Sequence, residues 1–179
     1  AATVVLQTTA DGSVANGTGV PVVYDGANSF GLIHWHTIYY GYAIFEFDLT
    51  GIDDTSTIDS VVFSYVNYYD GTSNTGFVDY FVEAYLGDGV VNVADFSTAG
   101  VNVGIGQVPV GTAGSAQDIV LNLAPVFENA LLGNLLTLRI GTTTIGHQIQ
   151  FASRESTYYG DADATLTLGV TAAPPPPPP

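Results

Sequence analysis

The hydrophobic residues of this chain come in short runs, and Gly, Asn or Asp interrupts them about every ten residues. Several runs alternate in polarity, as in Thr165 to Val170, where the threonines and the large aliphatic side chains fall on opposite faces. A period of two is typical of a β-strand with one buried face. Strands at this spacing, separated by turn residues, predict an all-β sandwich or barrel.

The expected strands follow these runs. They are Thr3 to Gln7, Pro21 to Tyr24, Tyr42 to Asp48, Ile58 to Asn67, Tyr80 to Leu86, Ile119 to Asn122, Leu135 to Ile140, Ile149 to Ser153 and Thr165 to Val170. Asp-Gly pairs at 11–12, 25–26, 70–71 and 88–89 are expected to make tight turns, because Gly accepts a positive φ. No run of about 18 apolar residues occurs, so no membrane-spanning helix is predicted.

One segment departs from the strand pattern. Between Asn122 and Gly133, apolar residues recur at three- and four-residue steps, Asn122 can cap a helix, and Pro125 lies in the first turn. We therefore predict a jelly-roll-like antiparallel β-sandwich with one short crossover helix. Residues 1–173 are expected to form this domain, and the six prolines at 174–179 a polyproline II tail or linker.

The charge of the chain excludes several partners. Seventeen acidic residues stand against two bases, Arg139 and Arg154, which gives a formal net charge of −15. Binding to nucleic-acid phosphates or to an anionic membrane needs clusters of Lys and Arg, so both are excluded. The chain has no Cys or Met and begins with Ala1-Ala2, which is typical of a processed, secreted protein. We expect it to be extracellular or on the cell surface.

Five segments, taken in order, suggest a family. They are Val4 to Asp11, Tyr42 to Leu49, Ile52 with Ser60 to Tyr65, Ile119 to Leu123 with the helix and Leu135 to Arg139 after it, and Phe151 to Ser156 before Ala164 to Leu168. In this order they resemble the DNRLRE type of secreted β-sandwich, which is related to carbohydrate-binding modules. Where that family carries an Arg pair this chain has Tyr42-Ala43, and where it often has a helical Trp this chain has Phe127. These departures affect the transfer of ligand contacts and leave the implied fold unchanged.

Motifs for hydrolytic nucleophiles are missing, so no enzyme activity is predicted. His34 and His36 could form a zinc or copper site together with His147 or a carboxylate, or could simply flank Trp35 in a loop. No cofactor is required, but calcium is an option because Asp11 near the first strand could meet Asp161 and Asp163 before the last one. The alternative is that these aspartates only stabilise turns. Asn16 begins an Asn-Gly-Thr sequon for glycosylation.

The chain is rich in aromatic residues, with 11 Tyr, 9 Phe and 1 Trp. Adjacent tyrosines cannot all be buried on one face of a strand, so some are expected to be exposed or covered by a partner. The residues expected to contact a partner or ligand are Trp35, Tyr39, Tyr40, Tyr68, Tyr69, Tyr158, Tyr159, Pro174, Pro175, Pro176, Pro177, Pro178 and Pro179.

Two functions fit this sequence. The first is a structural subunit of an extracellular fibre or surface layer, whose copies join head to tail through the proline tail. Edge-strand pairing through Thr3 to Gln7 or Thr165 to Val170 is the competing joint. The second function is a carbohydrate-binding module of a larger secreted protein, with surface glycans as partners and the prolines as a linker. Because a binding module has no need to avoid lysine, the sequence favours assembly.

Overall fold

A computed structural model describes residues 1–17, 19–25, 29–36, 39–72, 75–159 and 163–179, and it describes the side chains of all of these except 29–36 and 39. The elements are β1 (Ala2–Asn16), β2 (Pro21–Tyr24), β3 (Ser29–His36), β4 (Tyr39–Asp48), β5 (Thr57–Gly71), β6 (Phe77–Leu86), the 3₁₀ turn η1 (Val93–Phe96), β7 (Val101–Pro109), β8 (Ala116–Leu121), α1 (Pro125–Gly133), β9 (Leu135–Gly141), β10 (His147–Ala152) and β11 (Thr165–Thr171).

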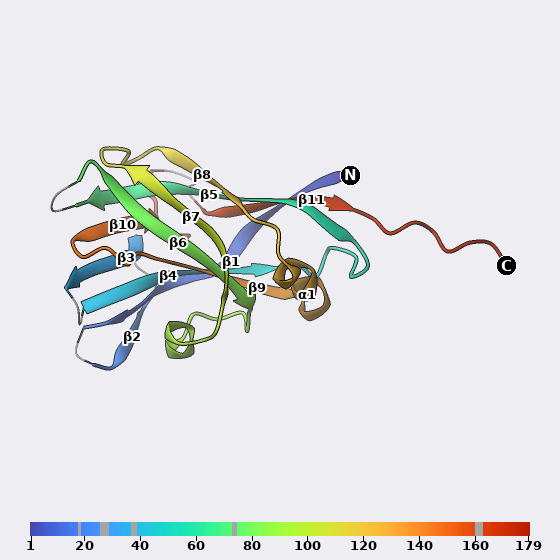
Figure 1. The fold of residues 1–179 in the computed structure, drawn as a ribbon, viewed down its shortest axis with the longest axis horizontal. Coiled ribbons are helices and arrows are strands. Elements are labelled where there is room, and N and C mark those ends of the chain that lie inside the picture. The colour runs from blue at the N-terminus through green and yellow to red at the C-terminus, as the bar shows by residue number, and fades with distance from the viewer. Residues whose placement is uncertain (18, 26–28, 37–38, 73–74, 160–162) are drawn as a thin grey trace.

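The strands form two antiparallel layers that share the long strands β1 and β5 (Figure 1). The first layer has the order β1, β11, β5 and β8, and the second has the order β2, β1, β4, β9, β6 and β7. At one end of the molecule β10 and β3 connect β5 to β4. The predicted all-β antiparallel sandwich is therefore confirmed.

The strand β1 passes from one layer to the other at a bulge. Residues 2–7 pair with β11, and the register against β4 shifts between Thr8 and Ala10. The Asp11-Gly12 pair lies inside β1, so the predicted turn at this position is wrong. A Cβ on Gly12 would lie 2.7 Å from the Tyr24 carbonyl oxygen, so glycine is needed there to let β2 approach. The Asp88-Gly89 turn is present, with Gly89 at φ 86°.

The core is built from aromatic and aliphatic side chains that point inward from both layers. Phe45 lies at the centre, with ring centroids 4.7 Å from Phe63 and 5.3 Å from Phe151 in edge-to-face contacts. All three rings are buried. The single helix covers the end of this core with Phe127 and Leu131.

The predicted crossover helix is present with different ends. Its N-cap is Ala124, which makes no side-chain cap, and Pro125 occupies the first turn. Asn122 therefore does not cap the helix: it lies two residues before the N-cap, and its backbone N–H donates to the Val103 carbonyl of β7. The left-handed residue that ends the helix is Asn134, with φ 64°, and not Gly133.

Replacement of Asn134 is expected to change stability in two directions. Asn134→Gly removes the steric cost of a left-handed residue and is expected to raise the free energy of unfolding by about 0.5 kcal/mol, while Asn134→Ala is expected to lower it by about 1 kcal/mol. Urea denaturation of the three proteins measures both values. Equal stabilities for the Gly and Ala variants would contradict the left-handed end of the helix.

The segment 87–100, which contains η1, covers the outer face of the second layer with a buried polar cluster. Glu46 on β4 has no exposed surface; its Oε1 accepts a hydrogen bond from the Thr137 hydroxyl at 2.6 Å, while its Oε2 has no partner of ordinary hydrogen-bond geometry among the described residues. Burial raises the pKa of Glu46 to about 7, and outweighs the opposite effect of the Thr137 hydroxyl. Asp95 of η1 is also buried, and accepts hydrogen bonds from the Tyr85 hydroxyl and the Asn92 N–H.

Arg139 on β9 is the cation of this buried cluster. Its Nε donates to Glu83 at 2.8 Å and its Nη1 donates to the Asp95 carbonyl at 2.7 Å. The guanidinium also lies 5.3 Å from the centre of the Tyr42 ring and 5.4 Å from that of Tyr85. Its side chain is only 8% exposed, so the charge is held almost entirely by neighbouring groups of the chain.

The two ends of the sandwich differ. Figure 1 shows the N-terminus, α1 and the proline tail at one end, while β10 and the C-terminal end of β5 lie at the other. Residues 171–179 are exposed, and the tail leaves β11 and points away from the layers. Within the described ranges, α1 is too short to cross a bilayer, and no helix has the length and apolar character needed for that.

Candidate functional site

A pocket of tyrosines and glutamines lies at the end of the sandwich opposite the tail. It has a volume of about 560 Å³ and is lined by Tyr68, Tyr69, Gln148, Gln150, Tyr158 and Tyr159. The tyrosines come from the C-terminal part of β5 and from the segment after β10, and the glutamines come from β10. The structure therefore brings together four of the aromatic residues that the sequence predicts to contact a partner.

A β-bulge explains how two consecutive tyrosines line the same pocket. Gln150 pairs with Tyr69, and the next residue, Phe151, pairs with Asn67, so that Tyr68 has no partner in the register. An extra residue of this kind turns its side chain out of the usual alternation. As a result Phe151 stays in the core, while Tyr68 and Tyr69 both reach the pocket.

The rings of this pocket are steeply inclined to one another. The Tyr158 and Tyr159 centroids are 4.8 Å apart at 87°, and those of Tyr68 and Tyr159 are 5.6 Å apart at 74°. Tyr158 is 71% exposed and Tyr69 is 49% exposed, so large apolar ring surfaces face solvent. The arrangement forms slots between rings rather than one flat platform.

A hydrogen-bonded loop supports the pocket from behind. The Asp70 carboxylate accepts bonds from the Gly111 N–H at 2.9 Å, from the Thr112 N–H at 3.1 Å and from the Asn67 amide at 2.7 Å. Burial alone would raise the pKa of Asp70, but these hydrogen bonds outweigh it and lower the pKa. A Cβ on Gly114 of the same loop would lie 3.0 Å from the Tyr159 ring, so the loop directly contacts this tyrosine. The charged Asp70 thus holds the back of the pocket in place.

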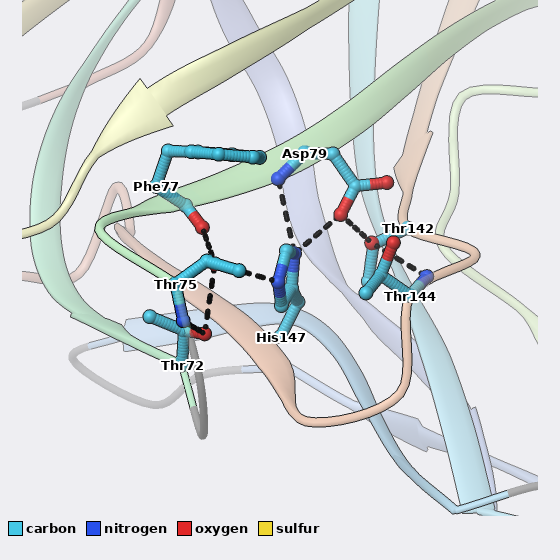
Figure 2. Close-up of polar contacts among 7 residues, drawn as sticks. All are labelled: Thr72, Thr75, Phe77, Asp79, Thr142, Thr144 and His147. Carbon is cyan, nitrogen blue, oxygen red and sulfur yellow. Dashed lines mark hydrogen bonds and ion pairs between the residues drawn. The ribbon is translucent and has the colours of Figure 1, made fainter.

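Next to the pocket, His147 ties the start of β10 to β6 and to the connection before it (Figure 2). Its Nε2 lies 3.2 Å from the Thr75 hydroxyl, and its Nδ1 contacts the Asp79 carboxylate and accepts from the Asp79 N–H at 3.1 Å. The Thr142 hydroxyl donates to the same carboxylate at 3.1 Å. The imidazole is buried, with 3% exposure.

The order hydroxyl, imidazole, carboxylate is that of a nucleophilic triad. However, Thr75 has one hydroxyl proton and donates it to the Phe77 carbonyl oxygen at 2.8 Å. The imidazole must therefore act as the donor toward Thr75, and has no lone pair free to accept that proton. The geometry gives Thr75 a structural contact and does not activate it.

His147 also bears on the predicted zinc or copper site. It lies opposite His34 in the register of β10 and β3, but both of its ring nitrogens have partners within the chain. His34, Trp35 and His36 lie in β3, and not in a loop. Their side chains fall outside the part of the molecule that the structure describes.

The aspartates of the predicted calcium site are only partly placed. Asp11 is 5% exposed; its Oδ2 accepts from the Arg154 N–H at 2.9 Å, and its Oδ1 has no hydrogen-bond partner within the described part of the chain. Burial raises the pKa of Asp11 to about 7, with smaller contributions from Glu155 and Asp163. Asp161 lies outside the described residues. Among those that are described, no three acidic or histidine side chains are grouped so as to hold a metal, and calcium remains a prediction.

The remaining predicted contact residues lie elsewhere. Tyr40 packs on Tyr42 and Phe96 under the 87–100 segment, away from the tyrosine pocket. The Tyr39 side chain, like that of Trp35, is outside the described set. Asn16 ends β1, and its side chain accepts from the Gly19 N–H at 2.7 Å, so glycosylation there stays a prediction. Thr165 to Val170 is not an edge, because β11 pairs with β1 on one side and with β5 on the other.

Sequence reasoning missed Gln148 and Gln150 as pocket residues and Glu46 as a buried acid. The glutamines alternate with Ile149 in a strand, and this pattern could have identified them as the outward face of β10. The chain matches no protein-family model and no curated protein sequence. The chemistry of the tyrosine and glutamine pocket is therefore inferred from its geometry alone.

Proposed function

We propose that this chain is a non-enzymatic structural subunit of an extracellular fibre or surface layer, and that the tail of one copy docks in the tyrosine pocket of the next. The observation that carries the proposal is that the pocket and the tail lie at opposite ends of the sandwich. The pocket is built on β10 and the C-terminal end of β5, and Figure 1 shows these strand ends at the end opposite the tail. A contact between two different surfaces of identical subunits does not close on itself unless the rotation completes a ring. Repetition of the contact then gives a filament.

The chemistry of the pocket suits a proline tail. A run of prolines has carbonyl acceptors but no N–H donors, and it holds an extended conformation at about 3.1 Å per residue, or roughly 19 Å for six. The pocket offers four tyrosine hydroxyls and the Gln148 amide as donors. Inclined aromatic rings form slots for pyrrolidine rings, as in other proline-binding grooves.

The carbohydrate-binding module remains the second candidate. It is favoured by the exposed Tyr158 ring in the same pocket as the Gln148 amide, because a sugar stacks on such a ring and bonds to such an amide. The inclination of 55° to 87° between the tyrosines offers a sugar no coplanar row, so the pocket supports assembly better.

Electron microscopy of negatively stained protein tests the proposal. The full chain is expected to form filaments, while a chain without residues 174–179 and the Tyr158→Ala variant are expected to form few or none. Loss of one buried aromatic anchor typically weakens a contact by about 10- to 100-fold. Tyr24→Ala is the matched control, since Tyr24 is 50% exposed on β2 and lies outside the pocket.

Three outcomes decide between the candidates. Filaments that depend on the tail and on Tyr158 support the proposal. Filaments that persist without the tail place the joint elsewhere and overturn it. Single particles in every sample, together with binding to a glycan array that Tyr158→Ala abolishes, establish the carbohydrate-binding module instead. Unchanged thermal unfolding of the truncated chain is the folding control, because the tail is fully exposed.

A further inference from the structure

The outer face of the first layer is open to solvent and carries few charges. One row of side chains crosses all four strands, because Val5 pairs with Thr167, Thr167 with Val62, and Val62 with Val120. Val120 is 76% exposed and Val5 is 60% exposed. Large apolar residues at both ends of one row, with nothing in the described chain covering them, make this face an unpartnered surface.

The neighbouring rows are polar. The row from Gln7 through Thr165 and Ser64 ends at Asp118, whose Oδ1 accepts a hydrogen bond from the Ser64 hydroxyl at 2.6 Å. In a chain with 17 acidic residues and a net charge of −15, this face holds two carboxylates: Asp118 at the end of its row, and Asp59 near the start of β5, which accepts a hydrogen bond from the outward Thr171 hydroxyl. A second copy of the chain is repelled by most of the surface, but less by this face.

We infer that this face of β1, β11, β5 and β8, called the flat face below, binds the flat face of a second copy and joins neighbouring filaments side by side. A two-fold axis parallel to the strands places Val5 opposite Val120 of the other copy, and Thr167 opposite Val62. The same axis places Asp118 opposite Gln7, whose amide can donate to the carboxylate. The face is thus complementary to itself in both its apolar and its polar row.

The size of the flat face explains why the contact needs a filament. Four strands spaced by about 4.8 Å and three outward residues spaced by about 6.7 Å give roughly 400 Å² on each copy. A stable interface between two free proteins typically buries about 800 Å² on each partner. Repetition along two filaments supplies the missing affinity, since each further contact is formed within a complex already joined. The contact between neighbouring filaments therefore rests on the proposed function.

Electron microscopy of the full chain tests the inference. The unmodified protein is expected to form bundles, while Val120→Asp is expected to give separate filaments of unchanged length. Ile105→Asp is the matched control, because Ile105 is 79% exposed on β7 of the other layer. Bundles that persist in Val120→Asp overturn the inference, and so does an equal loss of bundles in Ile105→Asp.

A second experiment does not depend on filaments. The chain has no cysteine, so Thr167→Cys introduces one thiol near the centre of the flat face, and Asn102→Cys introduces one on exposed β7 as a control. With a short bismaleimide at high protein concentration, Thr167→Cys is expected to form dimers at least tenfold faster. Equal rates overturn the inference. Absence of filaments in the unmodified protein refutes the proposed function. In that case the ratio of cross-linking rates still tests, by itself, whether two copies bind through the flat face.

Discussion

Replacement of Arg139 by methionine is expected to lower the free energy of unfolding by about 2 to 4 kcal/mol. This is somewhat less than the usual cost of about 3 to 5 kcal/mol for breaking a fully buried ion pair, because the Glu83 side chain is 26% exposed. Methionine keeps most of the side-chain volume between the Tyr42 and Tyr85 rings, but it donates nothing to Glu83 or to the Asp95 carbonyl. The Asp95 carbonyl and the Glu83 carboxylate are then left without this donor. Chemical denaturation followed by tryptophan fluorescence measures the effect.

The other arginine of the chain is the matched control. Arg154 is exposed, and its guanidinium donates to the Thr9 carbonyl. Arg154→Met is therefore expected to cost about 1 kcal/mol or less. The double variant Arg139→Met, Glu83→Gln should recover part of the lost stability, because it removes the uncompensated carboxylate. Equal losses of stability in Arg139→Met and Arg154→Met would contradict a larger stabilising role for the buried Arg139.

Acidification from pH 8 to pH 5 is expected to stabilise the protein by several kcal/mol. The pKa values of Asp11 and Glu46 are both raised to about 7 in the folded state by burial. The folded chain therefore binds more protons than the unfolded chain, and the free energy of unfolding falls as the pH rises toward and through 7. Each group contributes on the order of 3 kcal/mol over this range, and burial also raises the pKa of Asp95.

Two variants separate these contributions. Glu46→Gln and Asp11→Asn each remove one titrating group, so each should flatten the dependence of stability on pH between 5 and 8, and the double variant should flatten it most. Asp48→Asn is the control, since Asp48 is exposed. A dependence on pH that survives in the double variant would contradict the assignment.

The stabilisation by acid has a lower limit. Hydrogen bonds lower the pKa of Asp70, so its contribution is present above the ordinary pKa of an aspartate and is lost as the pH falls through the folded value. Because Asp70 supports the tyrosine pocket, strong acid should loosen the pocket before the core unfolds. The stability maximum is thus expected between the ordinary carboxyl range and pH 5.

The alternation of side chains predicted most of the strands, because the period of two is a direct result of one-sided burial. Strand β7 was not predicted, since its sequence from Val101 to Pro109 contains two glycines and leaves Ile105 exposed. The turn at Asp11 was wrong because pairing with β4, Asp11 with Phe45 and Gly12 with Ile44, overrides the local preference of an Asp-Gly pair.

The tyrosine pocket was also predictable from the sequence only in part. Adjacent tyrosines indicated exposure of at least one ring in each pair, and Tyr68, Tyr69, Tyr158 and Tyr159 do line one pocket. Their common location depends on the bulge at Tyr68 and on the pairing of β5 with β10, which are contacts between distant parts of the chain. No local pattern carries such information, and the roles of Gln148 and Gln150 follow from the same pairing.

Both arginines form hydrogen bonds within the subunit, and this has a consequence for any polymer of the chain. Arg139 donates to the Asp95 carbonyl and Arg154 to the Thr9 carbonyl, while each subunit adds a net charge of −15. A filament of such subunits behaves as a polyelectrolyte, which concentrates counterions from the medium along its length. Its growth and bundling should then depend on ionic strength, with multivalent cations acting more strongly than sodium. The dissolved salt of the surroundings would supply the positive charge that the sequence almost entirely lacks.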